Sequence, residues 1–170
     1  MIGPLVSAGV ALIAAPEAGV AEALCRPHES GPSVLVQVEG IKDRTGSLRA
    51  ELYPDNDEDF LADDNALIAQ NKTFRRLPIP LPARGNTATA CLRAPGPGTY
   101  SLVVIHDRDG KRAFSVTHDG VGFAGNPRLG WSRPPAASAR IRIGAGQTET
   151  RIVMNYRHGL FSFGPIGGSK

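Results

Sequence analysis

Residues Thr99–His106 read TYSLVVIH, a stretch that is almost continuously apolar. Unbroken apolar character over this length is typical of a strand that is buried on both faces. Two earlier stretches, Val34–Val38 and Leu48–Leu52, alternate between apolar and polar side chains, as half-buried antiparallel strands do. The polar turn Gly40–Gly46 between them predicts that these two strands pair as a hairpin or meander. We therefore predict an antiparallel sheet with Thr99–His106 at its centre.

The rest of the chain continues the β pattern. Further strands are expected at Ser138–Ile143 and Gln147–Tyr156, and a loop with a short helix within Glu58–Gln70. The 14 prolines favour loops and edge strands and argue against a helical domain. Strands at this spacing predict an all-β fold, an antiparallel β-sandwich of about seven strands. We assign residues 24–158 to this one domain and residues 159–170 to a flexible C-terminal tail.

The N-terminus carries the pattern of an export signal. Leu5–Ala15, LVSAGVALIAA, is a short apolar run, and Ala21-Glu22-Ala23 follows it with the small residues that signal peptidase requires. The pattern predicts a signal-peptide helix over residues 1–23, although that segment contains no Lys or Arg, and a buried helix is the alternative. The run is too short to span a membrane. We expect a periplasmic or secreted protein that does not span the membrane after cleavage.

The two cysteines, Cys25 and Cys91, both lie beyond the predicted cleavage site. An exported chain with an even pair of cysteines is expected to oxidise them, so we predict a Cys25–Cys91 disulfide. Alternation along Asn86–Arg93 places Cys91 on the strand face opposite Leu92. The disulfide should therefore lie outside the main core and attach the N-terminal arm to the sheet.

The charge pattern argues against a nucleic-acid partner. The formal net charge is only +3 at pH 7. The arginines, Arg49 among them, are scattered over strand-like stretches with no aromatic residues interleaved, which is typical of a solvated sheet face. We expect no binding to nucleic acid.

Two acidic residues after the central strand, Asp107 and Asp109, resemble the opening of a calcium loop. The match stops at residues 111–113, Lys-Arg-Ala, which supply positive charge and no oxygen ligand. Asp109-Gly110 is instead a strong signal for a tight hairpin turn. We predict a hairpin here and no bound metal.

Two His-Asp pairs, His106-Asp107 and His118-Asp119, raise the alternative of a metal-dependent or hydrolytic enzyme. A tight turn at Asp109 would place His118 far along the returning strand, and only an open loop would let the two pairs converge. The disulfide removes both thiols, and no serine lies in a G-x-S-x-G elbow. We therefore expect no catalytic residues, no cofactor and a non-enzymatic protein.

A binding or envelope-associated accessory module is the preferred function. Its partner is expected to be an envelope protein or a glycan, because exposed aromatic rings stack on sugar rings or anchor protein partners. Core packing is the alternative role for the aromatic residues. The candidate binding residues are Asp107, Asp109, Asp119, Phe123 and Trp131.

Four motifs together resemble a known family. They are VxVxG at Val36–Gly40, G-x-L-x-x-x-L-Y at Gly46–Tyr53, G-x-Y followed by apolar residues and H-D at Gly98–Asp107, and G-x-G-F-x-x-N-P at Gly120–Pro127. The chain is similar in these motifs to the bacterial secreted proteins grouped as domain of unknown function 2141. The resemblance implies an export signal and a β-sandwich of the transthyretin or prealbumin type. It implies no particular activity.

Overall fold

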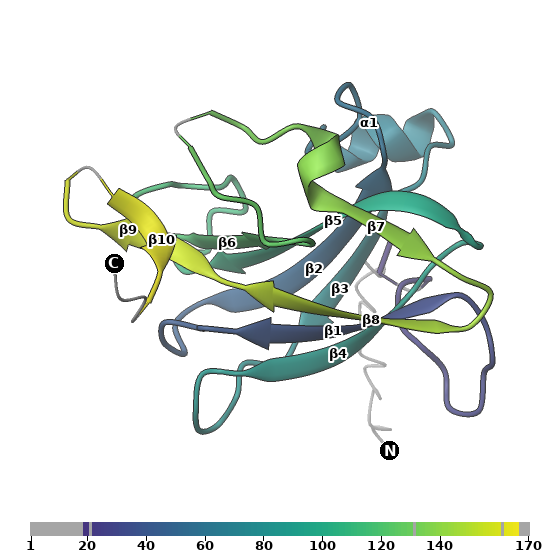
Figure 1. Ribbon diagram of the computed structural model, residues 1–170, viewed down its shortest axis with the longest axis horizontal. Helices are drawn as coiled ribbons and strands as arrows, with labels where there is room; N and C mark the ends of the chain where they lie inside the picture. The colour runs from purple at the N-terminus through teal and green to yellow at the C-terminus, as the bar shows by residue number, and fades with distance from the viewer. Residues whose placement is uncertain (1–18, 21, 131, 161, 167–170) are drawn as a thin grey trace, which may run out of the picture.

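The computed structural model describes residues 19–20, 22–130, 132–160 and 162–166. Its strands form two sheets that pack face to face as an all-β sandwich (Figure 1). The smaller sheet has the order β4-β1-β8, and the larger has the order β10-β9-β6-β5-β2-β3, with β7 also paired to β5. The elements are β1 (Ser33–Glu39), β2 (Ser47–Pro54), α1 (Asp64–Ala69), β3 (Arg75–Ile79), β4 (Ala88–Arg93), β5 (Gly98–Asp107), β6 (Gly120–Phe123), the 3-10 helix η1 (Ala136–Ala139), β7 (Arg140–Ile143), β8 (Gln147–Val153), β9 (Asn155–His158) and β10 (Ser162–Pro165).

Strand β5 is the central strand that its apolar sequence predicts. It pairs with β2, β6 and β7, and its residues from Ser101 onward are buried. Leu102 and Val104 join the core between the sheets, whereas Val103 and Ile105 join a second apolar cluster on the other face of the larger sheet. A strand with both faces covered requires apolar side chains at successive positions.

The core between the sheets contains the alternating residues of β1 and β2, but these two strands do not pair. Strand β1 pairs with β4 and, in parallel, with β8, while β2 pairs with β3 and β5. The predicted hairpin or meander is therefore wrong. Both edges of β1 are already occupied, so the turn that begins at Gly40 carries the chain from one sheet to the other.

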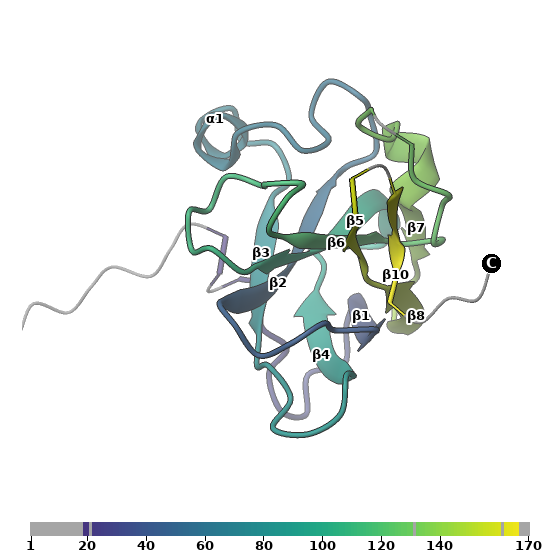
Figure 2. The ribbon, with the colours of Figure 1, turned by 90° about the vertical axis from the view of Figure 1, so that its left-hand side faces the viewer.

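The second apolar cluster covers the outer face of the larger sheet. Helix α1 lies within the predicted stretch and contributes Leu67 to this cluster. The side chain of Asp63 caps the helix by accepting a hydrogen bond from the backbone N–H of Ala66. Figure 2 shows α1, the β5–β6 loop and the segment that leads to η1 arranged around this face of β5 and β6. The outer face is thus covered by loops and not left to solvent.

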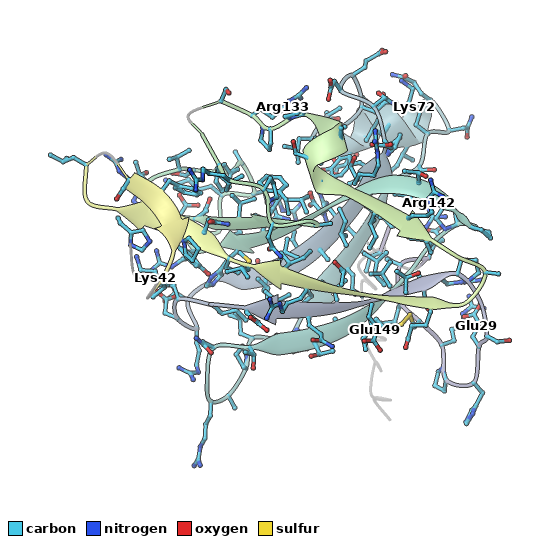
Figure 3. The ribbon with its side chains drawn as sticks, viewed as in Figure 1. Glu29, Lys42, Lys72, Arg133, Arg142 and Glu149 are labelled. Atoms are coloured by element: carbon cyan, nitrogen blue, oxygen red, sulfur yellow. A yellow bond between two sulfur atoms is a disulfide. The ribbon has the colours of Figure 1, made fainter. Side chains whose placement is uncertain are left out.

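The predicted disulfide is present between Cys25 and Cys91, with a Cα–Cα distance of 5.7 Å (Figure 3). Cys91 is half-buried and its neighbour Leu92 is fully buried, which confirms that the bond lies outside the core. A hydrogen bond close to the disulfide also links the arm to β4: the carbonyl of Ala23 accepts from the backbone N–H of Arg93. Most of the predicted signal peptide, residues 1–18 and 21, lies outside the described residues.

The C-terminal segment contributes a strand to the larger sheet. Strand β10 pairs with β9 in antiparallel register, where the sequence suggested a flexible tail from residue 159. Within the described part of the chain, no helix is both long enough and apolar enough to cross a membrane.

Candidate functional site

A cavity of about 600 Å³ lies on the outer face of the larger sheet. Strands β5 and β6 form one apolar wall, and Val103 and Phe123 stand side by side there in the strand register. The other walls come from the segment before α1, the β5–β6 loop, the segment before η1 and β10. Their apolar side chains are Leu61, Ala62, Ala113, Phe114, Val116, Leu129, Pro134 and Phe163.

Four polar side chains form one side of this cavity, and they come from two adjacent strands. Arg49, Glu51 and Tyr53 alternate along β2, so they share the face that points away from the sandwich core. Arg76 of β3 is the register partner of Glu51. The pleat of two paired strands therefore brings these side chains together.

Glu51 is the centre of this polar group and is only 2% exposed. Its Oε1 accepts hydrogen bonds from Nε of Arg49 and Nε of Arg76, both at 2.9 Å, and its Oε2 accepts from the Tyr53 hydroxyl at 2.7 Å. Burial, and then the charge of Glu51, raise the pKa of Tyr53, so its hydroxyl stays protonated and donates. A buried carboxylate with three donors meets the requirement that buried charge be paired.

The guanidinium of Arg49 connects the cavity to the β5–β6 loop. Its Nη1 lies 3.2 Å from Oδ2 of Asp107, and its Nη2 donates to the backbone carbonyl of Arg112 at 3.1 Å. Each of its three nitrogens therefore has a protein partner. The Arg49 side chain is 13% exposed, so the prediction that it forms part of a solvated sheet face is wrong.

Arg76 has fewer protein partners for its nitrogens than Arg49 has. Its Nη1 lies 2.8 Å from Oδ2 of Asp64, and its Cζ lies 5.0 Å from the centre of the Phe74 ring. Burial lowers the pKa of Arg76, but the carboxylates of Glu51 and Asp64 outweigh burial and raise it. Among the described residues, none accepts a hydrogen bond from its Nη2.

The β5–β6 connection is a wide loop. Pairing of the two strands ends at His106 and Gly120, which leaves residues 107–119 outside the ladder. The predicted tight hairpin at Asp109-Gly110 is therefore wrong. The loop is open, as the convergence of the two His-Asp pairs would require.

Two buried carboxylates explain why the loop is open. Asp119 accepts hydrogen bonds from the backbone N–H groups of Arg108 and Ser115, both at 2.8 Å, so it joins the two halves of the loop. Asp107 accepts from the backbone N–H of Gly110 at 2.8 Å. These bonds satisfy amide groups that a ladder would otherwise have paired.

The open loop brings three of the predicted binding residues together. One carboxylate oxygen from each of Asp107, Asp109 and Asp119 lies within 4.8 Å of the others, a grouping that could hold a metal ion. All three carboxylates already accept hydrogen bonds from loop N–H groups, and Asp109 also pairs with Lys111 at 3.3 Å. Their evident role is to shape the loop.

The histidines do not join these carboxylates. His106 is fully buried, and its Nδ1 accepts from the Tyr156 hydroxyl at 2.7 Å while its Nε2 donates to the Thr45 carbonyl at 2.9 Å. This tautomer follows because the Thr45 carbonyl can only accept, so Nε2 carries the proton and Nδ1 of the neutral ring is the acceptor. Burial lowers the pKa of His106, which keeps the ring neutral. His118 is exposed on the loop.

Of the two aromatic residues predicted to bind a partner, the structure describes Phe123 and not Trp131. Phe123 is 4% exposed, lies 6.1 Å from the Phe60 ring and lines the cavity. Trp131 lies outside the described residues, although its neighbours Gly130 and Ser132 line the cavity. Of the predicted binding residues that the structure describes, Phe123 alone lines the cavity, and the sequence missed its polar side.

The G-x-G-F-x-x-N-P motif is explained by packing. A side chain at Gly120 would overlap the Tyr156 ring, and a Cβ at Gly122 would lie 2.5 Å from Ile152 Cγ2. The Asn126 side chain donates to the carbonyl of Arg151 at 2.8 Å and accepts from the N–H of Val153 at 2.7 Å. The motif therefore lets β6 and the following turn pack against β8.

The fold and the cavity define an all-β sandwich with an amphipathic pocket on the outer face of one sheet. The chain belongs to a family described as uncharacterized proteins conserved in bacteria, DUF2141, whose model matches residues 36–151. This match confirms the resemblance that the four motifs suggested. No curated protein and no solved structure matches the chain significantly.

Proposed function

We propose that this protein is an exported, non-enzymatic binding module of the bacterial envelope, and that its ligand occupies the cavity on the outer face of the larger sheet. The observation that carries the proposal is the cavity itself. Its volume of about 600 Å³ falls within the range of small-molecule sites. Its lining combines apolar walls with a small group of fixed polar side chains, as such sites do.

A small amphipathic molecule fits this lining best. Val103, Ile105, Val121 and Phe123 form a continuous apolar surface that would contact the body of the ligand. Phe114 and Val116 line the same cavity from the β5–β6 loop and are 42% and 47% exposed, so their apolar surface is accessible to a ligand. An envelope protein or a glycan as partner remains a prediction.

Export is supported by the disulfide and the N-terminal sequence. Disulfides persist in oxidising compartments such as the periplasm and the cell exterior. The Cys25–Cys91 bond joins the N-terminal arm to a strand 66 positions further along the chain. These features support the proposal that the protein acts in the periplasm or outside the cell.

The enzymatic alternative receives less support from the same geometry. Both ring nitrogens of His106 are engaged by Tyr156 and Thr45, so neither is available to a metal or a substrate. Asp107 and Asp119 are engaged by loop amides. A binding role needs no change in these bonds.

Titration with N-phenyl-1-naphthylamine, a neutral apolar fluorophore, tests the proposal on the exported protein. We expect a saturable rise in fluorescence with one probe per chain. Ala113→Trp places a large ring at an exposed position that lines the cavity and should weaken binding about ten-fold or more. Ala83→Trp, at an exposed position outside the cavity, is the matched control.

The wild-type titration decides the outcome whatever the folding of either variant. A chain that gives no saturable signal does not use this cavity for apolar ligands, and the proposal fails. It also fails if Ala113→Trp, shown by circular dichroism to be folded, binds the probe as tightly as Ala83→Trp.

A further inference from the structure

We infer that the cavity selects amphipathic carboxylates, with the anionic head bound to Arg76 and the apolar chain on the β5–β6 wall. This inference rests on the proposed function and names the class of ligand. It depends on two observations: the unequal use of donors and acceptors around the cavity, and the fixed position of one guanidinium.

Five of the six carboxylate oxygens that the described residues contribute to the cavity lining already have protein partners. Both oxygens of Glu51 accept from protein donors. Asp63 caps α1 through Oδ1, and Asp64 accepts from the backbone N–H of Asn65 and pairs with Arg76. At these five oxygens, a ligand that presents a donor would have to compete with existing bonds.

Hydrogen-bond donors are in surplus. Arg76 carries five N–H groups, and only Nε and Nη1 have partners among the described residues. Arg76 lines the cavity, and its Nη2 is not among the buried side-chain atoms that lack a partner in the described part of the chain, so it is accessible. A ligand group that binds Nη2 of Arg76 must therefore be a hydrogen-bond acceptor.

Arg76 is held in place for this contact. Glu51 fixes its Nε, Asp64 fixes its Nη1, and its Cζ lies over the Phe74 ring. A guanidinium whose orientation is fixed loses little freedom when it binds a planar carboxylate. Arg49, by contrast, has a protein partner for every nitrogen.

Competition against bound N-phenyl-1-naphthylamine distinguishes the ligand classes. The three competitors are decanoate, decanol and decylammonium, which share one chain length and differ in head group. We expect decanoate to displace the probe at about a ten-fold lower concentration than decanol, as one added charged hydrogen bond implies. Decylammonium should be the weakest of the three.

Arg76→Gln tests the assigned residue. It should weaken decanoate about ten-fold and leave decanol unchanged. Arg142→Gln is the matched control, because Arg142 is an exposed arginine of β7 that does not line the cavity (Figure 3). Both variants are compared with the wild type by thermal unfolding.

The outcomes separate this inference from the proposed function. If the fluorophore does not bind, the proposed function fails. If it binds and decanol competes as well as decanoate, the cavity exists as a site but the carboxylate inference is wrong. An Arg76→Gln chain that keeps the wild-type preference for decanoate overturns the role of Arg76, and the wild-type comparison of decanoate with decanol holds even if that variant does not fold.

Discussion

Glu51 holds the polar side of the cavity together. Its carboxylate neutralises Arg49 and Arg76 and accepts the Tyr53 hydroxyl. Glu51→Gln removes the charge, so two largely buried guanidiniums lose a counter-ion while each keeps one other carboxylate. We expect a loss of about 2 kcal/mol in the free energy of unfolding, measured by urea denaturation at pH 7.

Tyr53→Phe is the matched control for that change. It removes one neutral donor from the same carboxylate and should cost about 1 kcal/mol. If Glu51→Gln costs no more than Tyr53→Phe, the charge of Glu51 does not stabilise the two arginines.

His106 gives the protein a pH dependence of known sign. Burial lowers the pKa of His106 below the ordinary 6.5, so the unfolded chain takes up a proton at a higher pH than the folded chain. The stability that neutral His106 contributes is therefore complete above about pH 6.5 and is lost as the pH falls below that value. Urea unfolding at pH 7.5, 6.5 and 5.5 should show this loss.

His106→Gln should reduce the slope of stability against pH in that range, whereas His118→Gln, on the exposed loop, should keep it. Equal slopes in the wild type and His106→Gln would show that His106 does not titrate on unfolding. The absolute stability of His106→Gln is irrelevant to this comparison, since only the slope is read.

At the scale of elements, the close packing of β6 on β8 depends on Gly122. A methyl group there would lie 2.5 Å from Ile152 Cγ2 and 2.8 Å from the Val153 carbonyl oxygen. Gly122→Ala should cost about 1–3 kcal/mol of stability through overpacking. Gly144→Ala, where no atom lies within 4 Å and φ is not positive, should change stability by less than about 0.5 kcal/mol. Thermal unfolding of the two variants checks the difference, and similar melting temperatures would refute the packing account of the motif.

The sequence predicts single strands better than their partners. The apolar run of β5 and the alternation in β1 and β2 identify three strands correctly, because burial on one or two faces leaves a direct mark on the residues. Pairing leaves no such mark. The strands β1 and β2 show the same alternation whether they lie in one sheet or in two, so the sequence could not exclude the hairpin that the structure lacks.

The prediction of a tight hairpin between β5 and β6 was wrong for a different reason. Asp109-Gly110 is a good local turn signal, but Asp119, ten residues further on, binds the N–H of Arg108 and holds the loop open. A turn pattern of two neighbouring residues contains no information about a hydrogen bond from a side chain about ten residues away. The same bond explains why the three acidic residues converge without either histidine.

At the scale of the whole molecule, the Cys25–Cys91 disulfide joins the N-terminal arm to the smaller sheet across 66 positions of sequence. Constraint of the unfolded chain by a loop of this length is worth about 4 kcal/mol in the entropic model. The double variant Cys25→Ser, Cys91→Ser should lose stability of that order in urea denaturation. A double variant within about 1 kcal/mol of the wild type would show that the bond is incidental to stability.

A thiol assay on protein recovered from the periplasm or the medium tests the same bond in its proposed compartment. We expect no reactive thiol in denaturant until a reductant is added. Two free thiols in the exported protein would contradict both the disulfide and the oxidising location.

The cavity is a property of the whole fold, and this is why the sequence did not reveal it. Its lining comes from β2, β3, β5, β6, β10, the segments before α1 and η1, and the β5–β6 loop. Its polar residues on β2 lie at alternate positions that normally face water. One signal was present. Because β5 is apolar on both faces, its neighbour β2 had to be covered on both faces too, and Arg49 and Glu51 are then buried charges that need partners.

The proposed ligand site lies on the outer face of the larger sheet. Backbone amide chemical-shift mapping of the ¹⁵N-labelled protein during titration with N-phenyl-1-naphthylamine would locate the bound probe on the fold. We predict saturable shifts concentrated at Glu51, Val103, Val121 and Phe123, with β1 and β4 unchanged. Shifts confined to the smaller sheet, or to the acidic residues of the β5–β6 loop, or no saturable shifts at all, would contradict the account.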